Sequence, residues 1–99
     1  MIDVKIERSG KMLSLCAVGH ADYAPYGSDI VCAGASSVIL GLSGALANVL
    51  THIELSSGLA VIRCPDTRDS RAAFKVAEKA LSLIAAEYPK NLKLICNMA

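Results

Sequence analysis

A histidine and a cysteine separated by eleven residues are the side chains of this chain that could together cleave a covalent bond. His20 follows a segment with the pattern of a strand, and Cys32 lies where a long helical pattern begins. A thiol in the first turn of a helix lies near unpaired backbone N–H groups and the positive end of the helix dipole, which favour the nucleophilic thiolate. A neutral imidazole could take the thiol proton and later deliver it to a leaving amine. Cys32 and His20 therefore have the side chains needed for a cysteine nucleophile and its general base.

Residues 21–28 form the loop between these two side chains. Pro25 restricts Ala24 to extended conformations, whereas Gly27 permits a positive φ. Tyr23 and Tyr26 have two interpretations, since they can grip a substrate or pack lightly on the surface. The residues expected to form a substrate loop, with Gly27 in a supporting position, are Ala21, Asp22, Tyr23, Ala24, Pro25, Tyr26 and Ser28.

Two polar residues close to the cysteine also have two interpretations each. Asp29 can cap the helix that carries Cys32, which is the favoured interpretation, or it can act as a third catalytic group that orients His20. Ser36 lies one turn after Cys32 on the same helix face. Its hydroxyl can bond near the thiol or donate to a backbone carbonyl one turn back.

A family signature is visible in the same stretch. The chain resembles the ribosomal-processing cysteine proteases, the Prp family, through Gly19-His20-Ala21, Gly27, Asp29-Ile30-Val31-Cys32-Ala33 and Ser36. The resemblance extends over the whole chain, which is expected to be one protease domain, residues 1–99. It implies that Cys32 and His20 are catalytic and that Gly19, Gly27, Asp29 and Ser36 support them. Gly34 and Ala35 depart from the pattern, because relatives carry a small residue followed by a branched one there.

The resemblance implies a cytoplasmic cysteine endopeptidase that needs no cofactor. Its substrate would be a ribosomal protein precursor of the large subunit, from which it removes the short N-terminal extension. Cys32 would attack the scissile carbonyl, and N–H groups at the helix start, including that of Cys32, would hold the oxyanion. A homodimer and a mobile loop that closes over bound peptide, with Gly27 as its hinge, are also implied. The alternative is a ribosome-assembly module that binds the same peptide without cleaving it.

Composition excludes several other classes of function. The net charge is +1, no block of Lys and Arg is present, and three Tyr and one Phe are the only aromatic residues, so direct nucleic-acid binding is not expected. Cys16, Cys64 and Cys96 lie in apolar runs, and no C-x-x-C pair is present. Free structural thiols in a reducing compartment and no metal site are therefore expected. Cys32 itself has a plain alternative as a small apolar residue of the helix.

Residues 30–53 contain no charged side chain and are long enough to span a membrane. Polar residues within them, and flanking segments that alternate like a sheet, favour a buried helix instead. No membrane partner is therefore expected. The first residues alternate apolar and charged side chains and lack the apolar segment of a signal peptide, which predicts a cytoplasmic location.

The elements that must position the site follow from periodicity. Alternation of Ile2, Val4 and Ile6 with charged residues predicts a first strand, paired through a turn at residues 9–11 with a second strand at 12–18. A helix is expected from about residue 29, with Ser28 or Asp29 as its cap, to about residue 50. Strands at 53–55 and 59–64, a helix at 71–88 capped by Asp69 or Ser70, and a strand at 92–96 complete the chain. The ββαββαβ order predicts a small α+β domain with a mostly antiparallel sheet packed against two helices.

Overall fold

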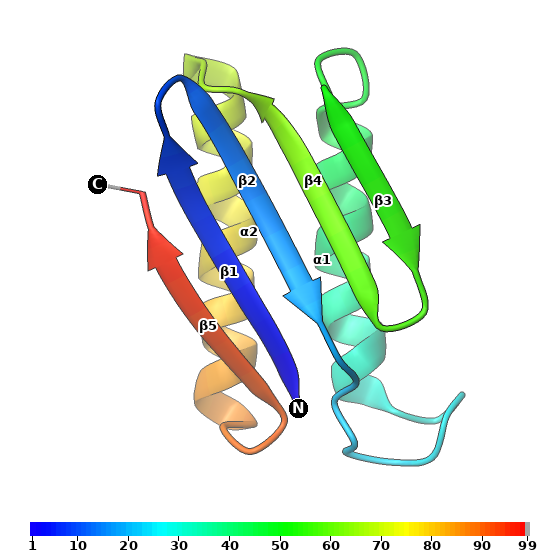
Figure 1. The fold of residues 1–99 in the computed structure, drawn as a ribbon. Helices are drawn as coiled ribbons and strands as arrows, with labels where there is room; N and C mark the ends of the chain where they lie inside the picture. The colour runs from blue at the N-terminus through cyan, green and yellow to red at the C-terminus, as the bar shows by residue number, and fades with distance from the viewer. Residues whose placement is uncertain (99) are drawn as a thin grey trace.

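Five strands and two helices follow one another in the predicted ββαββαβ order (Figure 1). The computed structural model describes residues 1–98. The elements are β1 (Ile2–Ser9), β2 (Met12–Val18), α1 (Ile30–Ala45), β3 (His52–Ser56), β4 (Leu59–Pro65), α2 (Arg68–Glu87) and β5 (Leu92–Asn97). The α+β fold class is confirmed.

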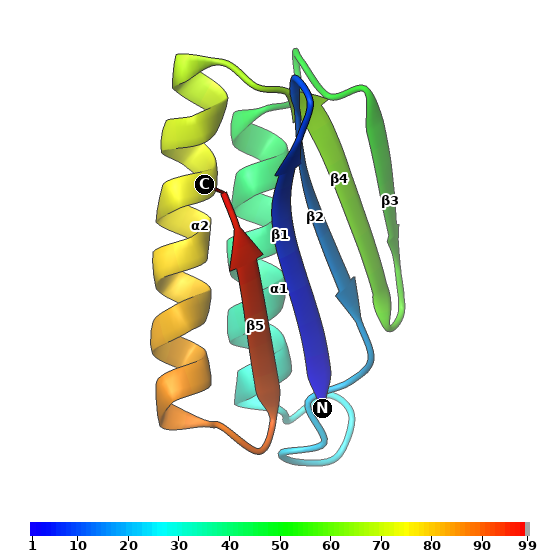
Figure 2. The same cartoon turned by 60° about the vertical axis from the view of Figure 1, so that its left-hand side comes forward.

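The strands form one sheet in the order β3-β4-β2-β1-β5. Neighbouring strands are antiparallel except β1 and β5, which run parallel because α2 carries the chain back before β5 begins. Both helices lie on the same face of the sheet, α1 behind β4 and β2 and α2 behind β1 (Figures 1 and 2). The sheet is mostly antiparallel, as predicted, and no helix among residues 1–98 covers its other face.

The core lies between the sheet and the helices. Alternation decides which strand residues enter it, because successive side chains point to opposite faces. Ile2, Val4 and Ile6 are buried, whereas the intervening Asp3 and Lys5 are exposed. On the helix side the buried positions of α2 recur at helical spacing: Ser70, Phe74, Ala77 and Leu81. Burial of each large apolar side chain contributes roughly 1.5–3 kcal/mol to stability.

The predicted end of the first helix is wrong. We expected it near residue 50, but α1 ends at Ala45 and residues 46–49 form hydrogen-bonded turns, with the N–H of Val49 and of Leu50 donating to the carbonyl of Leu46. The apolar pattern continues through residues 46–50, so the sequence does not show where the helix ends. Gly41 and Gly44 in the last turns lower the helix propensity, so the backbone can leave the helix there.

The predicted start and cap of the second helix are also wrong. We expected a start at residue 71 with Asp69 or Ser70 as the cap, but α2 begins at Arg68 and Thr67 caps it. The Ser70 N–H donates to Oγ1 of Thr67 at 3.1 Å, and the Thr67 N–H donates to Oγ of Ser70 at 2.8 Å. This capping box satisfies two N–H groups reciprocally, and Ser70 is its inner partner rather than the cap.

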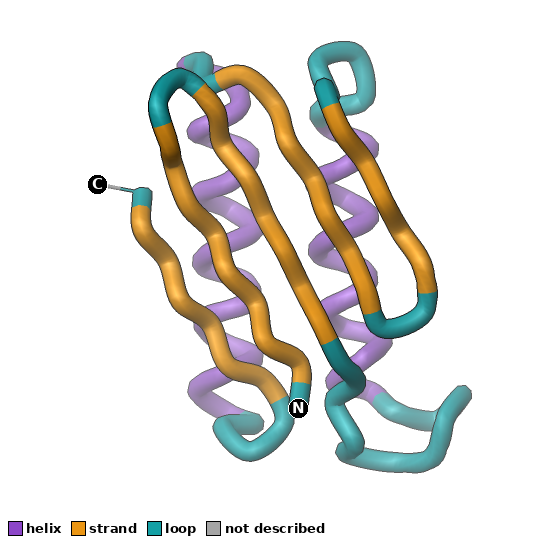
Figure 3. Tube along the Cα trace, viewed as in Figure 1, coloured by secondary structure: helices purple, strands orange, loops and turns teal. Residues whose placement is uncertain are grey.

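The long uncharged segment is divided into three parts. The tube of Figure 3 shows it leaving α1, passing through a loop and entering the edge strand β3. Within residues 1–98, neither helix has the length and apolar character that crossing a membrane requires.

Candidate active site

His20 and Cys32 are brought together by the end of one strand and the start of one helix. Gly19 follows β2 with a φ of +101°, and a Cβ there would collide with the carbonyl oxygen of Met1. Only glycine fits this position, which turns the chain so that His20 enters the site. Cys32 is the third residue of α1 and is half-buried. Both residues line one open cavity of about 770 Å³.

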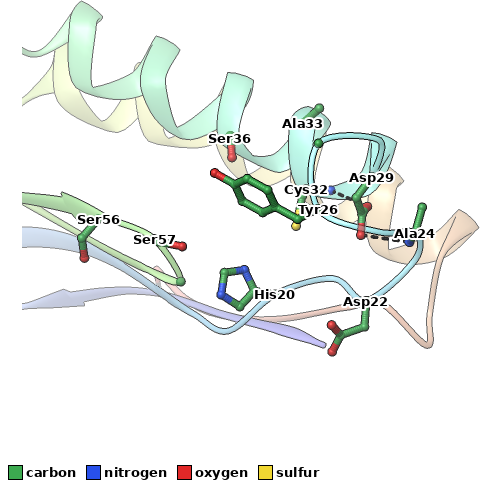
Figure 4. Close-up of a pocket in the computed structure, with 12 residues that line it drawn as sticks. His20, Asp22, Ala24, Tyr26, Asp29, Cys32, Ala33, Ser36, Ser56 and Ser57 are labelled. Carbon is green, nitrogen blue, oxygen red and sulfur yellow. Dashed lines mark hydrogen bonds between the residues drawn. The ribbon is translucent and has the colours of Figure 1, made fainter.

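Three segments form the walls of this cavity (Figure 4). The loop after β2, the first turns of α1 and the turn between β3 and β4 each contribute residues, and the sulfur of Cys32 and the imidazole of His20 lie on opposite walls. The lining residues are His20, Asp22, Ala24, Tyr26, Gly27, Asp29, Cys32, Ala33, Ser36, Ser56, Ser57 and Gly58.

The carboxylate of Asp29 holds the loop and the helix together. Its Oδ1 accepts hydrogen bonds from the N–H groups of Val31 and Cys32, both at 3.0 Å. Its Oδ2 accepts from the N–H groups of Tyr23 at 2.9 Å and Ala24 at 3.2 Å. Asp29 is therefore the N-cap of α1, as the favoured interpretation had it, and it also fixes the loop.

These four hydrogen bonds determine the charge state of Asp29. Burial by itself raises the pKa of a carboxyl group, because it disfavours the charged form. The N–H groups of Cys32, Ala24, Tyr23 and Val31 outweigh that effect and lower the pKa of Asp29 from its usual 3.8. The residue is ionised at neutral pH, and a negative charge is fixed at the positive end of α1.

The expected role of the Cys32 N–H group is not met in this structure. We predicted that this group would help to hold an oxyanion, but it donates to Oδ1 of Asp29 instead. The cap at Asp29 was itself expected, but the prediction did not take into account that a cap at this position engages the N–H of Cys32. One N–H group cannot donate fully to the carboxylate of Asp29 and to an oxyanion at the same time.

The sulfur of Cys32 has a backbone hydrogen-bond donor of its own. The N–H group of Ala21 points at Sγ with a separation of 3.3 Å, and the carbonyl of Ala21 accepts from Nδ2 of Asn91 at 2.9 Å. The side chain of Ala21 is 0% exposed and belongs to the core, so it does not face the cavity as a substrate loop residue would. The N–H of Ala21 thus helps to fix the position of the sulfur at the cavity.

The two loop tyrosines have different surroundings. Tyr23 packs edge to face against Tyr88, with ring centroids 5.2 Å apart and an interplanar angle of 80°, which fits the surface-packing interpretation. Tyr26 is 94% exposed and lines the cavity. Figure 4 shows its ring lying across the cavity with the hydroxyl toward Ser36. Tyr26 is the tyrosine that has the position to contact a bound chain.

The rest of the loop forms a tight turn. The N–H and Oγ of Ser28 donate to the carbonyl of Pro25 at 3.0 and 3.1 Å, and Gly27 within this turn has a φ of +92°. The positive φ expected of Gly27 is confirmed. Pro25 and Ser28 close the turn, while Asp22, which itself has a positive φ of 55°, is part of the cavity wall.

Ser36 faces the cavity one turn after Cys32, as its spacing predicted. The serine that donates to a carbonyl one turn back is its neighbour, since Oγ of Ser37 bonds the carbonyl of Ala33 at 2.9 Å. The side chain of Ser36 instead faces the cavity that holds the thiol.

Sequence reasoning missed one wall of the site. Ser56, Ser57 and Gly58 were interpreted only as a turn between strands, yet they line the cavity on the side of His20. Their position follows from the antiparallel pairing of β2 with β4, in which Val18 is the partner of Leu59. A local pattern does not show which strands become neighbours, so only long-range pairing could have revealed this wall.

The other cysteines and the second histidine lie outside the cavity. Burial raises the pKa of the Cys64 thiol and of the Cys96 thiol, which disfavours their thiolates. Oε2 of Glu54 lies 4.0 Å from Nε2 of His52, and both of these side chains are more than half exposed. Among residues 1–98, His, Cys, Asp and Glu do not form a cluster of three or more that could hold a metal ion.

Comparison with known proteins gives one consistent result. The model of a family described as cysteine protease Prp matches residues 1–93. A ribosomal processing cysteine protease Prp from Staphylococcus aureus is 33% identical over 100 residues, covering 94% of each chain. One from Bacillus subtilis is 30% identical over 111 residues, covering 99% of each chain.

A solved structure agrees with these relatives. The crystal structure of an essential ribosomal processing protease Prp from S. aureus, in complex with a covalently linked product peptide, superposes with a TM-score of 0.84. The identity is 30%, and the match covers 100% of both chains. Sequence and fold therefore point to the same family.

Proposed function

Since this chain is a cysteine protease of the Prp family, we propose that Cys32 is its nucleophile and His20 its general base and acid. The observation that carries the assignment is the shared cavity, where the sulfur receives the N–H of Ala21 and the imidazole lies on the opposite wall. Cys16, Cys64 and Cys96 lie on strands outside this cavity.

The proposed reaction has two halves. His20 takes the proton of the Cys32 thiol, and the thiolate attacks the carbonyl carbon of the scissile bond to give a tetrahedral oxyanion. The C–N bond breaks, His20 gives its proton to the leaving amine, and a thioester remains on Cys32. Water then attacks the thioester while His20 accepts its proton, which releases the new carboxylate and restores the thiol.

The proposed substrate is the short N-terminal extension of a large-subunit ribosomal protein, cleaved in the cytoplasm. The relatives are called ribosomal processing cysteine proteases, which supports this class of substrate. A cavity of about 770 Å³ is large enough to take several side chains of an extended peptide. Residues 21–28 would close over the peptide, with Gly27 as the hinge.

Mass spectrometry tests the proposed function directly. The candidate ribosomal precursor is incubated with the wild-type protein, Cys32→Ala and Cys16→Ala, and the masses of the products are determined. We expect wild type and Cys16→Ala to release the extension and Cys32→Ala to lose more than about 10³-fold in rate, as expected when a nucleophile is removed. Near-normal turnover by Cys32→Ala would overturn the assignment. Binding of the intact precursor without any cleavage by wild type would support the non-catalytic module instead.

A homodimer is part of the proposal. Apolar side chains are exposed on neighbouring elements, with Leu40 of α1 at 57%, Ile53 of β3 at 47% and Leu55 of β3 at 42%. Such side chains on one side of a small protein favour association. Sedimentation equilibrium measures the mass in solution, and a monomer at the concentration used for catalysis would contradict this part of the proposal.

A further inference from the structure

The turn between β3 and β4 is attached to the backbone next to His20. Gly58 is the last residue of this turn, and its carbonyl accepts the N–H of Gly19 at 2.9 Å. The bond continues the β2–β4 ladder beyond its last paired residues, Val18 and Leu59. This hydrogen bond therefore holds the turn beside Gly19, the residue that precedes His20.

Gly58 also lies next to the imidazole, where it leaves no room for a side chain. A Cβ at this position would lie 2.9 Å from Nε2 of His20, 3.4 Å from Cε1 and 3.6 Å from Cδ2. The outer edge of the ring thus occupies the space that a side chain at position 58 would need. A separation of 2.9 Å is shorter than side chains tolerate, so any residue larger than glycine must displace the ring or the turn.

Hydrogen bonding does not fix the position of the ring. His20 is exposed, it follows a glycine with a φ of +101°, and within residues 1–98 its side chain takes part in no hydrogen bond. A general base must be held at hydrogen-bond distance from the group whose proton it takes. The turn at Gly58 bounds the space of the ring on the side of Nε2, a limit that the strand end does not supply.

We infer that Gly58 is a positioning residue, which sets the place of the His20 imidazole opposite Cys32 by leaving room for the ring at the turn. The inference rests on the proposed function, since it gives His20 the role of base and acid. It adds the β3–β4 turn to the machinery as the surface against which the imidazole is held.

A purely local reason for the glycine makes a different prediction. Gly58 has a φ of +76°, and a positive φ alone favours glycine in a hairpin turn. Gly10, in the turn between β1 and β2, has the same requirement with a φ of +61°, but a Cβ there would meet nothing within 4 Å. The two glycines share backbone strain and differ in the contact with His20, so Gly10→Ala is the matched control for Gly58→Ala.

The kinetic test compares kcat and KM of wild type, Gly58→Ala, Gly58→Asn and Gly10→Ala on the precursor peptide. Asparagine tolerates a positive φ better than alanine, so Gly58→Asn keeps the test available if the alanine variant does not fold. We expect kcat to fall roughly 10- to 100-fold in both Gly58 variants with KM within about twofold, as for a misplaced catalytic group. Gly10→Ala should stay within about twofold of wild type. Equal losses in the Gly10 and Gly58 variants would overturn the inference.

A second measurement does not depend on cleavage. The ring nitrogens and protons of His20 and His52 are followed by NMR in the same proteins. We expect the His20 ring signals to shift in the Gly58 variants and to coincide with wild type in Gly10→Ala, while those of His52 stay constant. Unshifted His20 signals in the Gly58 variants would refute the positioning role even if cleavage is lost. If the His20 signals shift in the Gly58 variants but the wild-type protein does not cleave the precursor, the result supports the positioning role and refutes only the proposed function.

Discussion

Replacing Asp29 by asparagine separates the structural role of this carboxylate from a catalytic one. The carboxylate accepts two N–H groups on each oxygen, Val31 and Cys32 on Oδ1 and Tyr23 and Ala24 on Oδ2. An asparagine side chain has one oxygen and one NH₂ group. In either orientation of the amide, two backbone donors lose their acceptor and face a third donor.

The size of the effect follows from which pair is lost. Asparagine is as good a helix cap as aspartate, so we expect its oxygen to stay on Val31 and Cys32 and the helix start to persist. Tyr23 and Ala24 then lose their partner, and the loop that forms one wall of the cavity moves. A displacement on the order of 1 Å costs about 10²-fold in kcat/KM. If Asp29 oriented His20 as the third member of a triad, the same change would cost about 10⁴-fold.

Single-residue hydrogen exchange and peptide cleavage are measured together on Asp29→Asn. We expect the amides of Tyr23 and Ala24 to lose protection and those of Val31 and Cys32 to keep it. Asp69→Asn is the control, because it removes a carboxylate from the first turn of α2, where Thr67 is the cap. Unchanged protection of all four amides would refute the reasoning that this carboxylate holds the loop.

Three further predictions concern thiols, acid and the hinge. Iodoacetamide at neutral pH should label Cys32 before Cys64 and Cys96, whose raised pKa values delay their labelling to higher pH; equal labelling of these cysteines would contradict the account of the site. Because the pKa of Asp29 in the folded chain lies below its usual 3.8, its support of the loop is complete above about pH 4 and is lost as the pH falls through the lowered value. Amide exchange of residues 21–28 measured from pH 5 to pH 2 checks this, and protection that is constant over the range would contradict it. Gly27→Val should slow turnover about tenfold with little change in Tm, since φ is +92° and nothing lies within 4 Å; unchanged kcat would argue against a hinge.

Short-range patterns predicted most of the fold. Alternation along β1 identified Ile2, Val4 and Ile6 as core residues, because burial of one sheet face imposes a period of two. The helix ends were less predictable. The end of α1 lies inside an apolar run, and the cap of α2 lies in a polar run with several residues that could serve as a cap, so the hydrophobic pattern marks neither boundary.

The site was predictable where its residues are close in sequence. The motif from Gly19 to Ser36 identified the two side chains that share the cavity, and the helix cap was recognisable at Asp29. The β3–β4 turn was not found, because its place beside His20 depends on a strand pairing formed across about forty residues of intervening chain. The engagement of the Cys32 N–H depends on side-chain direction, which residue types alone do not specify.

The contact between Ala21 and Asn91 links assembly of the site to completion of the fold. Ala21 donates its N–H to the thiol and is held from its other side by an amide that lies 70 residues further along the chain. Asn91 immediately precedes β5, the last strand to emerge during synthesis, and its carbonyl also accepts the N–H of Ile2 at 2.9 Å. Contacts between such distant segments cost more loop-closure entropy than local ones, and reliance on them slows folding. A growing chain therefore has both His20 and Cys32 long before it has the anchor that directs a donor at the sulfur.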